Sequence, residues 1–345
     1  APLFITAEVT SYKVDSAIMA SWVDITPKPE EKMVDINFNR DRVAASLAQL
    51  RSQVDYPAVD TIVTYLNGVP AGRQEGAVGK SLKYEELIDR VMATTSPSIT
   101  NLEAVVTTLP PPEKIDRKYS KDSTGVQTMM SYWIANHNGE YSIDFRTVNG
   151  RIVANSNPHQ IRPSAGVYRM YIGSLIYGKI ASGAISQSTL LLNGQSVGTC
   201  LERMLAESEV SCTNILGDIV GWGASDSLLK SQGFESTTLT AGAGLTSASD
   251  LSNWFLKVYS GNIVTKPHSS ALLQSLNRET NRSGIPAGSP GIFVANKAGS
   301  AGRVRHESAI VYHPGGMYVL SVMSEGSTAS NFADLASEIN KILDQ

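Results

Sequence analysis

The sequence predicts a two-domain chain of the α+β class. Short strand and helix patterns alternate through the first third of the chain, and three consecutive prolines at 110–112 interrupt them. Beyond the prolines, strand patterns at both ends enclose a helical middle, which favours one antiparallel sheet packed against helices. We therefore predict a small α+β domain over residues 1–113 and a larger α+β domain over residues 114–345.

In the first domain, a helix is expected after either Asn39 or Asp41, whose side chains are suited to cap its first turn. This helix runs through Leu47 and Leu50. Proline lacks the N–H group that a strand ladder needs, so residues 110–112 are predicted to form a stiff linker. The other expected elements are strands at 34–38, 61–66 and 104–109, a turn at Asn67-Gly68 and a helix at 84–92.

In the second domain, Asn149-Gly150 is typical of a two-residue hairpin turn, and it separates two strand patterns. Either Thr246 or Ser247 is expected to cap a helix that ends near Val258. The remaining patterns predict helices at 126–135, 197–205, 213–220 and 332–343, and strands at 141–148, 151–154, 307–312 and 318–323.

The composition limits the classes of partner. The formal net charge is -3, and lysine and arginine form no long basic run, so we expect no nucleic-acid binding. No stretch approaches the roughly 18 unbroken apolar residues of a membrane span. Because the chain begins at Ala1 rather than Met, we expect an extracellular or cell-envelope protein, anchored through an N-terminal segment absent from this chain.

The two cysteines, Cys200 and Cys212, lack the C-x-x-C spacing and the neighbouring histidines of a zinc site. No metal and no other cofactor is therefore expected. One disulfide suits an exported protein, and two buried free thiols are the alternative.

Four stretches of the second domain have the order and character of known motifs: residues 162–171, 208–210, 244–256 and 296–300. Through them, the chain from about residue 126 to residue 345 resembles the class A β-lactamase and penicillin-binding-protein superfamily of serine hydrolases. The last stretch is the most specific, because it resembles the family's Lys-Thr-Gly placed just before two strands joined by a Gly-Gly turn. The resemblance implies the fold of these hydrolases.

The family's first motif, Ser-x-x-Lys at a helix start, places a nucleophile and its base on one helix face. The corresponding residues here are Gly166 and Arg169. Glycine has no oxygen to attack an acyl carbon, and arginine stays protonated and cannot act as a base. The resemblance therefore implies that this catalytic pair has been lost.

The other two motifs are also incomplete. Ser-Asp-Asn corresponds to Ser208 and Val210, so a branched hydrocarbon replaces the amide that holds the substrate. In the motif that resembles Lys-Thr-Gly, Lys297 and Gly299 remain, but Ala298 lacks the hydroxyl presented to the substrate carboxylate. Losses in three separate motifs favour a natural pseudoenzyme over an engineered knock-out.

Three further residues are alternative candidates for catalysis. Ser164 has Val167 rather than a base three residues later, and we expect it to cap a helix. Ser227-Leu228-Leu229-Lys230 has the Ser-x-x-Lys spacing but lies well downstream of the expected position. Glu235 lies in the interval where the family has its deacylating glutamate, but the context differs and we expect a solvated turn residue.

The residues that remain point to a binding cleft. Ser208, Lys297 and Arg169 are its candidate ligand-binding residues. Arg303 and Arg305 follow Lys297 closely and would leave the cleft positively charged, although strand-edge arginines are the alternative. The resemblance also implies that a Cys200–Cys212 disulfide would join the two helices bordering this cleft.

The first domain has a softer resemblance. Over about residues 21–110, its succession of elements, including the Glu75-Gly76-Ala77-Val78-Gly79 loop, resembles the domain described as peptidoglycan-binding in vancomycin-resistance W-type proteins and some cell-wall transpeptidases. This resemblance identifies no functional residue. A plain spacer domain is the alternative.

The leading hypothesis is a cell-envelope pseudoenzyme of the serine hydrolase fold that binds peptidoglycan-type ligands or scaffolds a cell-envelope protein. A working serine hydrolase, acting on β-lactams or D-alanyl peptides, is the first alternative. A purely structural interaction protein whose cleft is filled by side chains is the second.

Overall fold

The computed structural model describes residues 2–94, 100–241 and 243–345. The chain forms two compact units, one of Ala1–Tyr65 with Val69–Arg117 and the other of Leu66–Gly68 with Lys118–Gln345. The boundary falls between Arg117 and Lys118 rather than at the expected 113/114. The predicted proline linker lies inside the first unit, because the carbonyl of Pro112 accepts a hydrogen bond from the Thr61 N–H (2.8 Å) and the chain continues into a paired strand.

Among its described residues, the first unit contains four small sheets, of strand orders β2-β1-β8, β10-β5-β6, β3-β4 and β7-β9. The Asn39 side chain accepts a hydrogen bond from the Arg42 N–H, so Asn39 and not Asp41 caps α2. Leu47 and Leu50 of α2 are buried in the core of this unit. The elements are β1 (Leu3–Ala7), β2 (Thr10–Val14), α1 (Ser16–Ser21), β3 (Val23–Lys28), η1 (Pro29–Glu31), β4 (Met33–Phe38), α2 (Arg40–Val54), β5 (Thr61–Leu66), β6 (Val69–Gln74), β7 (Gly79–Leu82), α3 (Tyr84–Met92), β8 (Asn101–Glu103), β9 (Val106–Leu109) and β10 (Glu113–Lys118).

The second unit has a five-stranded antiparallel sheet of order β12-β11-β18-β17-β16 and a three-stranded sheet of order β13-β15-β14. Ser247 caps α9, accepting a hydrogen bond from the Asp250 N–H. The elements are α4 (Ser123–Asn136), β11 (Glu140–Thr147), β12 (Val153–Ser156), β13 (Arg162–Pro163), α5 (Arg169–Ala181), α6 (Val197–Ala206), α7 (Val210–Val220), α8 (Asp226–Ser231), β14 (Thr238–Thr240), β15 (Ala243–Thr246), α9 (Ala248–Ser260), α10 (Lys266–Asn277), β16 (Val294–Ala301), β17 (Val304–Val311), β18 (Tyr318–Glu325) and α11 (Ala329–Leu343).

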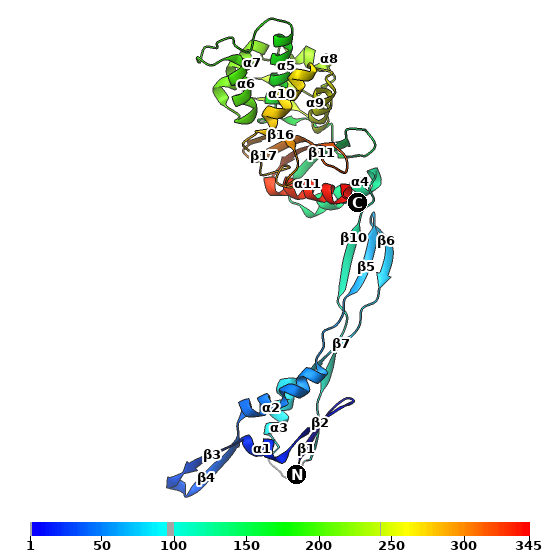
Figure 1. Cartoon of the computed structure of the whole chain (residues 1–345), viewed down its shortest axis with the longest axis vertical. Helices are drawn as coiled ribbons and strands as arrows, with labels where there is room; N and C mark the ends of the chain where they lie inside the picture. Colours follow the sequence, from blue (N-terminus) through cyan, green and yellow to red (C-terminus); the bar gives the residue numbers. More distant parts are fainter. Residues whose placement is uncertain (1, 95–99, 242) are drawn as a thin grey trace. The chain divides into compact units, whose positions relative to one another are not determined.

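The five-stranded sheet separates two hydrophobic cores (Figure 1). Helices α4 and α11 cover one face, and α5, α6, α7, α9 and α10 gather on the other. Successive side chains of a strand point to opposite faces, so in β18 Leu320 and Val322 join the first core while Val319 and Met323 join the second. This arrangement confirms the predicted antiparallel sheet packed against helices.

Cys200 of α6 and Cys212 of α7 form a disulfide, which confirms the predicted pairing and excludes two free thiols. The bond joins the two helices on either side of the Ser208 loop. Within the three described ranges, no helix has both the length and the apolar character needed to cross a membrane. The same ranges hold no cluster of three or more His, Cys, Asp or Glu residues suited to a metal ion.

Candidate functional site

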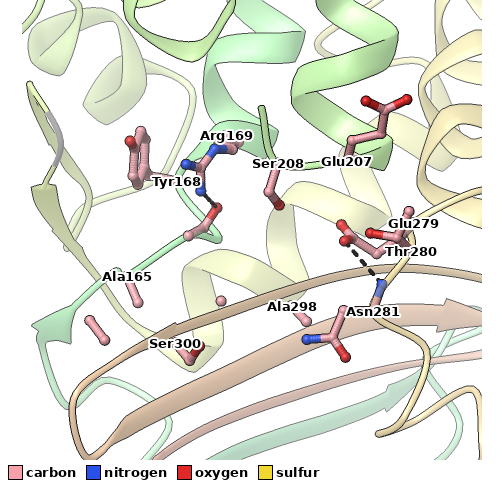
Figure 2. Close-up of a pocket in the computed structure, with 13 residues that line it drawn as sticks. Ala165, Tyr168, Arg169, Glu207, Ser208, Glu279, Thr280, Asn281, Ala298 and Ser300 are labelled. Carbon is pink, nitrogen blue, oxygen red and sulfur yellow. Dashed lines mark hydrogen bonds between the residues drawn. The ribbon is translucent and has the colours of Figure 1, made fainter. Parts of the chain in front are cut away.

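A cleft of about 390 Å³ lies in the second unit, where the chain entering α5, the loop between α6 and α7, the segment after α10 and the edge strand β16 meet (Figure 2). The sequence places three of its candidate motifs on these segments. The lining residues are Ala165, Gly166, Tyr168, Arg169, Glu207, Ser208, Glu279, Thr280, Asn281, Ala298, Gly299, Ser300 and Ala301.

Gly166 and Gly299 allow the chain before α5 to approach β16 closely. A Cβ atom added to Gly299 would lie 2.4 Å from the Gly166 nitrogen, so a side chain at 299 is sterically excluded. A Cβ added to Gly166 would lie 2.8 Å from Arg169 Nη1 and 3.1 Å from the Gly299 Cα. Gly166 lies in a turn and the helix begins only at Arg169, so the two residues are not stacked on a helix face as the motif spacing implied.

The Arg169 guanidinium is held from three sides. Its Nε donates to Thr213 Oγ1 (2.9 Å), and its Nη1 donates to the Gly166 carbonyl (3.2 Å), as the dashed line in Figure 2 marks. The guanidinium carbon lies 5.2 Å from the centre of the Tyr168 ring, within the range of a cation–π contact. Within the described part of the chain, no carboxylate lies within ion-pair distance of this guanidinium, although Glu209 and Glu279 are near enough to interact with its charge.

Lys297 is completely buried, and its ammonium is surrounded by acceptors. Nζ donates to Ser208 Oγ (2.6 Å) and to the Leu205 carbonyl (2.8 Å), and it forms an ion pair with Glu279. An ammonium has three N–H donors, so these three partners saturate it. Lys297 was a candidate ligand-binding residue, but in this structure its amine has no donor left for a ligand.

Burial lowers the pKa of Lys297 and raises the pKa of Glu279, and each charge opposes the shift of its partner. The negative charge of Glu279 and its hydrogen bond to Nζ favour the ammonium form of Lys297, against the effect of burial. Glu279 also accepts a weak hydrogen bond from the Asn281 N–H (3.4 Å), which Figure 2 shows on the cleft wall.

A second buried carboxyl, that of Glu307 in β17, lies behind this wall. Burial raises its pKa to about 7, against the opposing effect of hydrogen bonds donated by the Ile285 N–H (3.0 Å) and Asn296 Nδ2 (2.8 Å). Glu279 and Glu307 were not predicted from the sequence, because neither lies in a recognised motif. The only signal for Glu307 was a charged residue within an apolar strand pattern, which predicts a buried and partnered carboxyl.

The backbone of β16 contributes polar groups to the cleft. β16 is the edge strand, and the Val294 carbonyl accepts a hydrogen bond from Arg282 Nη2 (3.2 Å) on its open side. Because the direction of backbone groups alternates along a strand, the N–H and C=O groups of Ala298 and Ser300 face the same open side. Both residues line the cleft.

Two residues of the cleft have a left-handed backbone that favours glycine: Ala165 (φ 46°) and Ser208 (φ 58°). Such conformations cost on the order of 1 to 3 kcal/mol and are found often at functional sites. Ser208 is held there by its hydrogen bond from Lys297. The strain is consistent with a position fixed for a polar contact.

Other candidate residues lie outside the lining of this cleft. Val210 begins α7 and is 61% exposed. Arg303, whose side chain is 81% exposed, lies near Glu325 (3.8 Å), and Arg305 lies in β17. The cleft therefore does not gain its positive charge from these two arginines, and Arg169 is the cation that lines it.

The alternative catalytic candidates are also separated from the cleft lining. Ser164 is buried, and its hydroxyl has no hydrogen-bond partner among the residues that the structure describes. The predicted N-cap role is wrong, because α5 begins five residues later and has no side-chain cap. Ser227 and Lys230 are exposed on the short helix α8. Glu235 is exposed in a turn, as expected.

An antiparallel five-stranded sheet covered by helices on both faces, with a cleft between its edge strand and the start of a central helix, defines the β-lactamase-like class of proteins. Residues 126–343 match the model of the Beta-lactamase enzyme family, and the chain belongs to this family. A comparison with curated proteins gives no match.

Solved structures with this fold match the second unit. The structure of PBP-A is 20% identical, with a TM-score of 0.60 over 66% of this chain and 98% of PBP-A. A β-lactamase from Sphaerobacter thermophilus is 17% identical, with a TM-score of 0.57 over 64% of this chain and 95% of its own. The TLA-3 extended-spectrum β-lactamase is 14% identical, with a TM-score of 0.60 over 65% and 100%. These likenesses establish the fold.

Proposed function

We propose that this protein is a pseudoenzyme of the β-lactamase fold, which binds ligands in its cleft without hydrolysing them and works in the cell envelope. The observation that supports inactivity is the pairing of Gly166 with Arg169 at the cleft. Position 166 offers no nucleophilic atom, and the guanidinium beside it, 3.2 Å from the Gly166 carbonyl, cannot accept a proton.

A working serine hydrolase is the second candidate, and one contact favours it. Ser208 Oγ lies 2.6 Å from Lys297 Nζ, a distance suited to a nucleophile and its base. However, Lys297 donates in this contact, and the adjacent Glu279 favours its charged form. A lysine that is an ammonium cannot remove the Ser208 proton.

Acylation separates these two candidates. We expect no mass increase when the intact protein is incubated with excess penicillin G, and no turnover of a chromogenic cephalosporin. Removing the nucleophile of a serine hydrolase costs on the order of 10⁶ in rate in the subtilisin case. A penicillin adduct that disappears in Ser208→Ala but persists in Ser227→Ala would contradict the proposal and identify Ser208 as the nucleophile.

The proposed ligands are peptidoglycan or a cell-envelope protein, with the first unit as the second binding region. The disulfide is consistent with an oxidising compartment outside the cytosol. We expect the full chain to co-sediment with purified peptidoglycan, and a chain of residues 118–345, confirmed as folded by circular dichroism, to co-sediment less. If neither protein co-sediments, peptidoglycan binding is contradicted, and a cell-envelope protein is the remaining proposed ligand.

A further inference from the structure

We infer that the cleft is a carboxylate-binding site centred on Arg169, in which Gly166 provides the space for the guanidinium. This inference rests on the proposed function, because it assumes that the cleft binds a ligand without reacting with it. The expected ligand carries one compact, singly charged carboxylate group.

Lys297, the lysine of the stretch that resembles Lys-Thr-Gly, is not available to bind a ligand. Lys297 lies beneath the surface, and its three N–H groups are used by Ser208, Leu205 and Glu279. The ion pair with Glu279 also neutralises its charge. A carboxylate entering the cleft would therefore gain little from Lys297.

Arg169 has the donors that Lys297 lacks. A guanidinium has five N–H donors, and Arg169 uses one on Nε and one on Nη1. Among the described residues, no acceptor is within hydrogen-bond distance of its other donors, although Arg169 lines the cleft. Adjacent donors on a planar guanidinium match the two oxygens of a carboxylate.

The guanidinium is fixed before any ligand binds. The Thr213 hydroxyl donates to the Glu209 carbonyl (2.6 Å), which turns its oxygen toward Arg169 Nε as an acceptor. The Tyr168 ring supports the guanidinium from another side. A side chain that is already ordered loses less entropy on binding, so preorganisation strengthens the site.

Gly166 and Arg169 form a matched pair. A Cβ atom at position 166 would lie 2.8 Å from Arg169 Nη1, closer than ordinary contacts allow, so any larger residue would displace the guanidinium. In the close-up, Arg169 is drawn between Tyr168 and Ser208, facing the strand that carries Ala298 and Ser300 (Figure 2). The Ser208 and Ser300 hydroxyls are further polar groups in the same lining.

The charge of the lining favours a single negative charge on the ligand. Glu207 and Glu279 both line the cleft together with Arg169. Glu279 is paired with Lys297 and Glu207 with Arg203 (3.3 Å), so Arg169 is left to balance one negative charge of a ligand. A phosphate monoester, with nearly two charges, would keep part of its charge unbalanced in the cleft. A peptide C-terminus and a sugar acid share the carboxylate chemistry and differ in the group attached to it.

The test is an NMR titration of the full ¹⁵N-labelled chain, following the Arg169 Nε–H and Gly166 N–H signals. We expect N-acetylglycine, a peptide-type carboxylate, or D-glucuronate, a sugar acid, to shift both signals. The compound that binds more tightly shows whether the carboxylate of the ligand belongs to a peptide or to a sugar. N-acetylglycinamide, which has no charge, is expected to shift neither. Inorganic phosphate is expected to bind more weakly than the better carboxylate.

Variants separate the guanidinium from general effects of charge. A charge-assisted hydrogen bond contributes about 1.5 to 3 kcal/mol, so Arg169→Gln should weaken carboxylate binding roughly ten- to a hundredfold. Gly166→Ala should weaken it while keeping the charge, and Arg169→Lys should weaken it through the loss of the two-pronged contact. Arg303→Gln, which removes an exposed arginine outside the cleft, is the matched control and should bind as the native chain does.

If Arg169→Gln does not fold, Gly166→Ala and Arg169→Lys carry the test. Equal binding of N-acetylglycine and its amide, tighter binding of phosphate, or native affinity in folded Gly166→Ala and Arg169→Lys would each overturn the inference. A penicillin adduct would overturn the proposed inactivity instead. The two failures are therefore distinguishable.

Discussion

At the scale of single residues, the cleft depends on a few positions with specific steric and polar demands. Gly299 is required because any Cβ there would collide with the Gly166 nitrogen, whereas Gly166 is limited mainly by the flexible Arg169 side chain. A substitution at 166 is therefore sterically possible if Arg169 moves or is shortened. Restoring a hydroxyl there is a practical experiment.

We expect Gly166→Ser with Arg169→Lys to remain without efficient turnover of a cephalosporin. Ala298 still lacks a hydroxyl, Lys297 remains saturated by its three partners, and an unpaired buried polar group on the substrate costs about 1 to 3 kcal/mol. Slow acylation, measured by intact mass, is the largest effect expected. The same double variant with Ala298→Thr is the comparison, and rates near those of ordinary β-lactamases in the double variant would refute the pseudoenzyme hypothesis.

The buried Glu307 carboxyl predicts a pH dependence of stability. Its pKa of about 7 in the folded chain lies above its usual value of 4.5, so the folded state binds the proton more tightly between these pH values. The free energy of unfolding should therefore fall as pH rises through this window, by about 3 kcal/mol at most from this group. Burial lowers the pKa of His306, which acts in the opposite direction, so the comparison must be with a variant.

Glu307→Gln removes this titration while keeping the shape of the side chain. We expect urea unfolding between pH 4.5 and 7.5 to give a free energy that falls less steeply with pH in Glu307→Gln than in the native chain. Glu325→Gln, on the partly exposed strand end, is the control and should follow the native profile. Parallel profiles for Glu307→Gln and the native chain would show that this carboxyl does not titrate in the window.

At the scale of elements, helices α6 and α7 hold the Ser208 loop between them. Cys200 and Cys212 join these helices, and Thr213 of α7 orients Arg169 at the start of α5. The disulfide therefore supports the side of the cleft that carries both Ser208 and the acceptor for Arg169. Loss of the disulfide should lower the stability of the second unit more than it changes the geometry of the cleft.

We expect Cys200→Ala with Cys212→Ala to lower the free energy of unfolding of the second unit by roughly 2 to 4 kcal/mol, because a short cross-link limits the unfolded chain. Denaturant unfolding with and without a reducing agent measures this. The native chain should lose stability on reduction, and the double variant should not respond. Two alkylatable thiols in the denatured, unreduced native chain would contradict the disulfide.

At the scale of the whole molecule, two compact units have separate hydrophobic cores. One cluster lies wholly in the first unit, around Trp22, and the other two lie on the two faces of the sheet in the second unit. Separate cores favour independent unfolding, because cooperativity depends on shared contacts. Trp22 is the only tryptophan of the first unit, since Trp133, Trp222 and Trp254 belong to the second.

We therefore expect two transitions in guanidinium unfolding followed by tryptophan fluorescence. Trp22→Phe should remove the fluorescence change of one transition and shift that transition to lower denaturant by circular dichroism, since it leaves a cavity in the first core. The second transition should stay in place. A single transition that moves as a whole in Trp22→Phe would show that the two units unfold together.

Much of the architecture could be predicted from the sequence because local signals agreed with the fold. Asn67-Gly68 and Asn149-Gly150 mark turns, and the apolar periodicity of residues 84–92 and 332–343 lies on helices. The strand limits at 61–66 were also correct. The predicted domain boundary differs from the observed one, because the carbonyl of Pro112 accepts a hydrogen bond from the neighbouring strand. The sequence pattern does not show this partner.

The sequence by itself determined which chemical groups are present at the cleft: a glycine and an arginine in place of a nucleophile and a base, and one pair of cysteines. Only the tertiary structure decided what those groups do. Lys297 is saturated by Leu205, Ser208 and Glu279, which lie 92, 89 and 18 positions earlier in the chain, and Arg169 is left as the cation of the cleft. Burial and the distance between atoms set the state of a charge, and both come from contacts between segments that are distant in sequence.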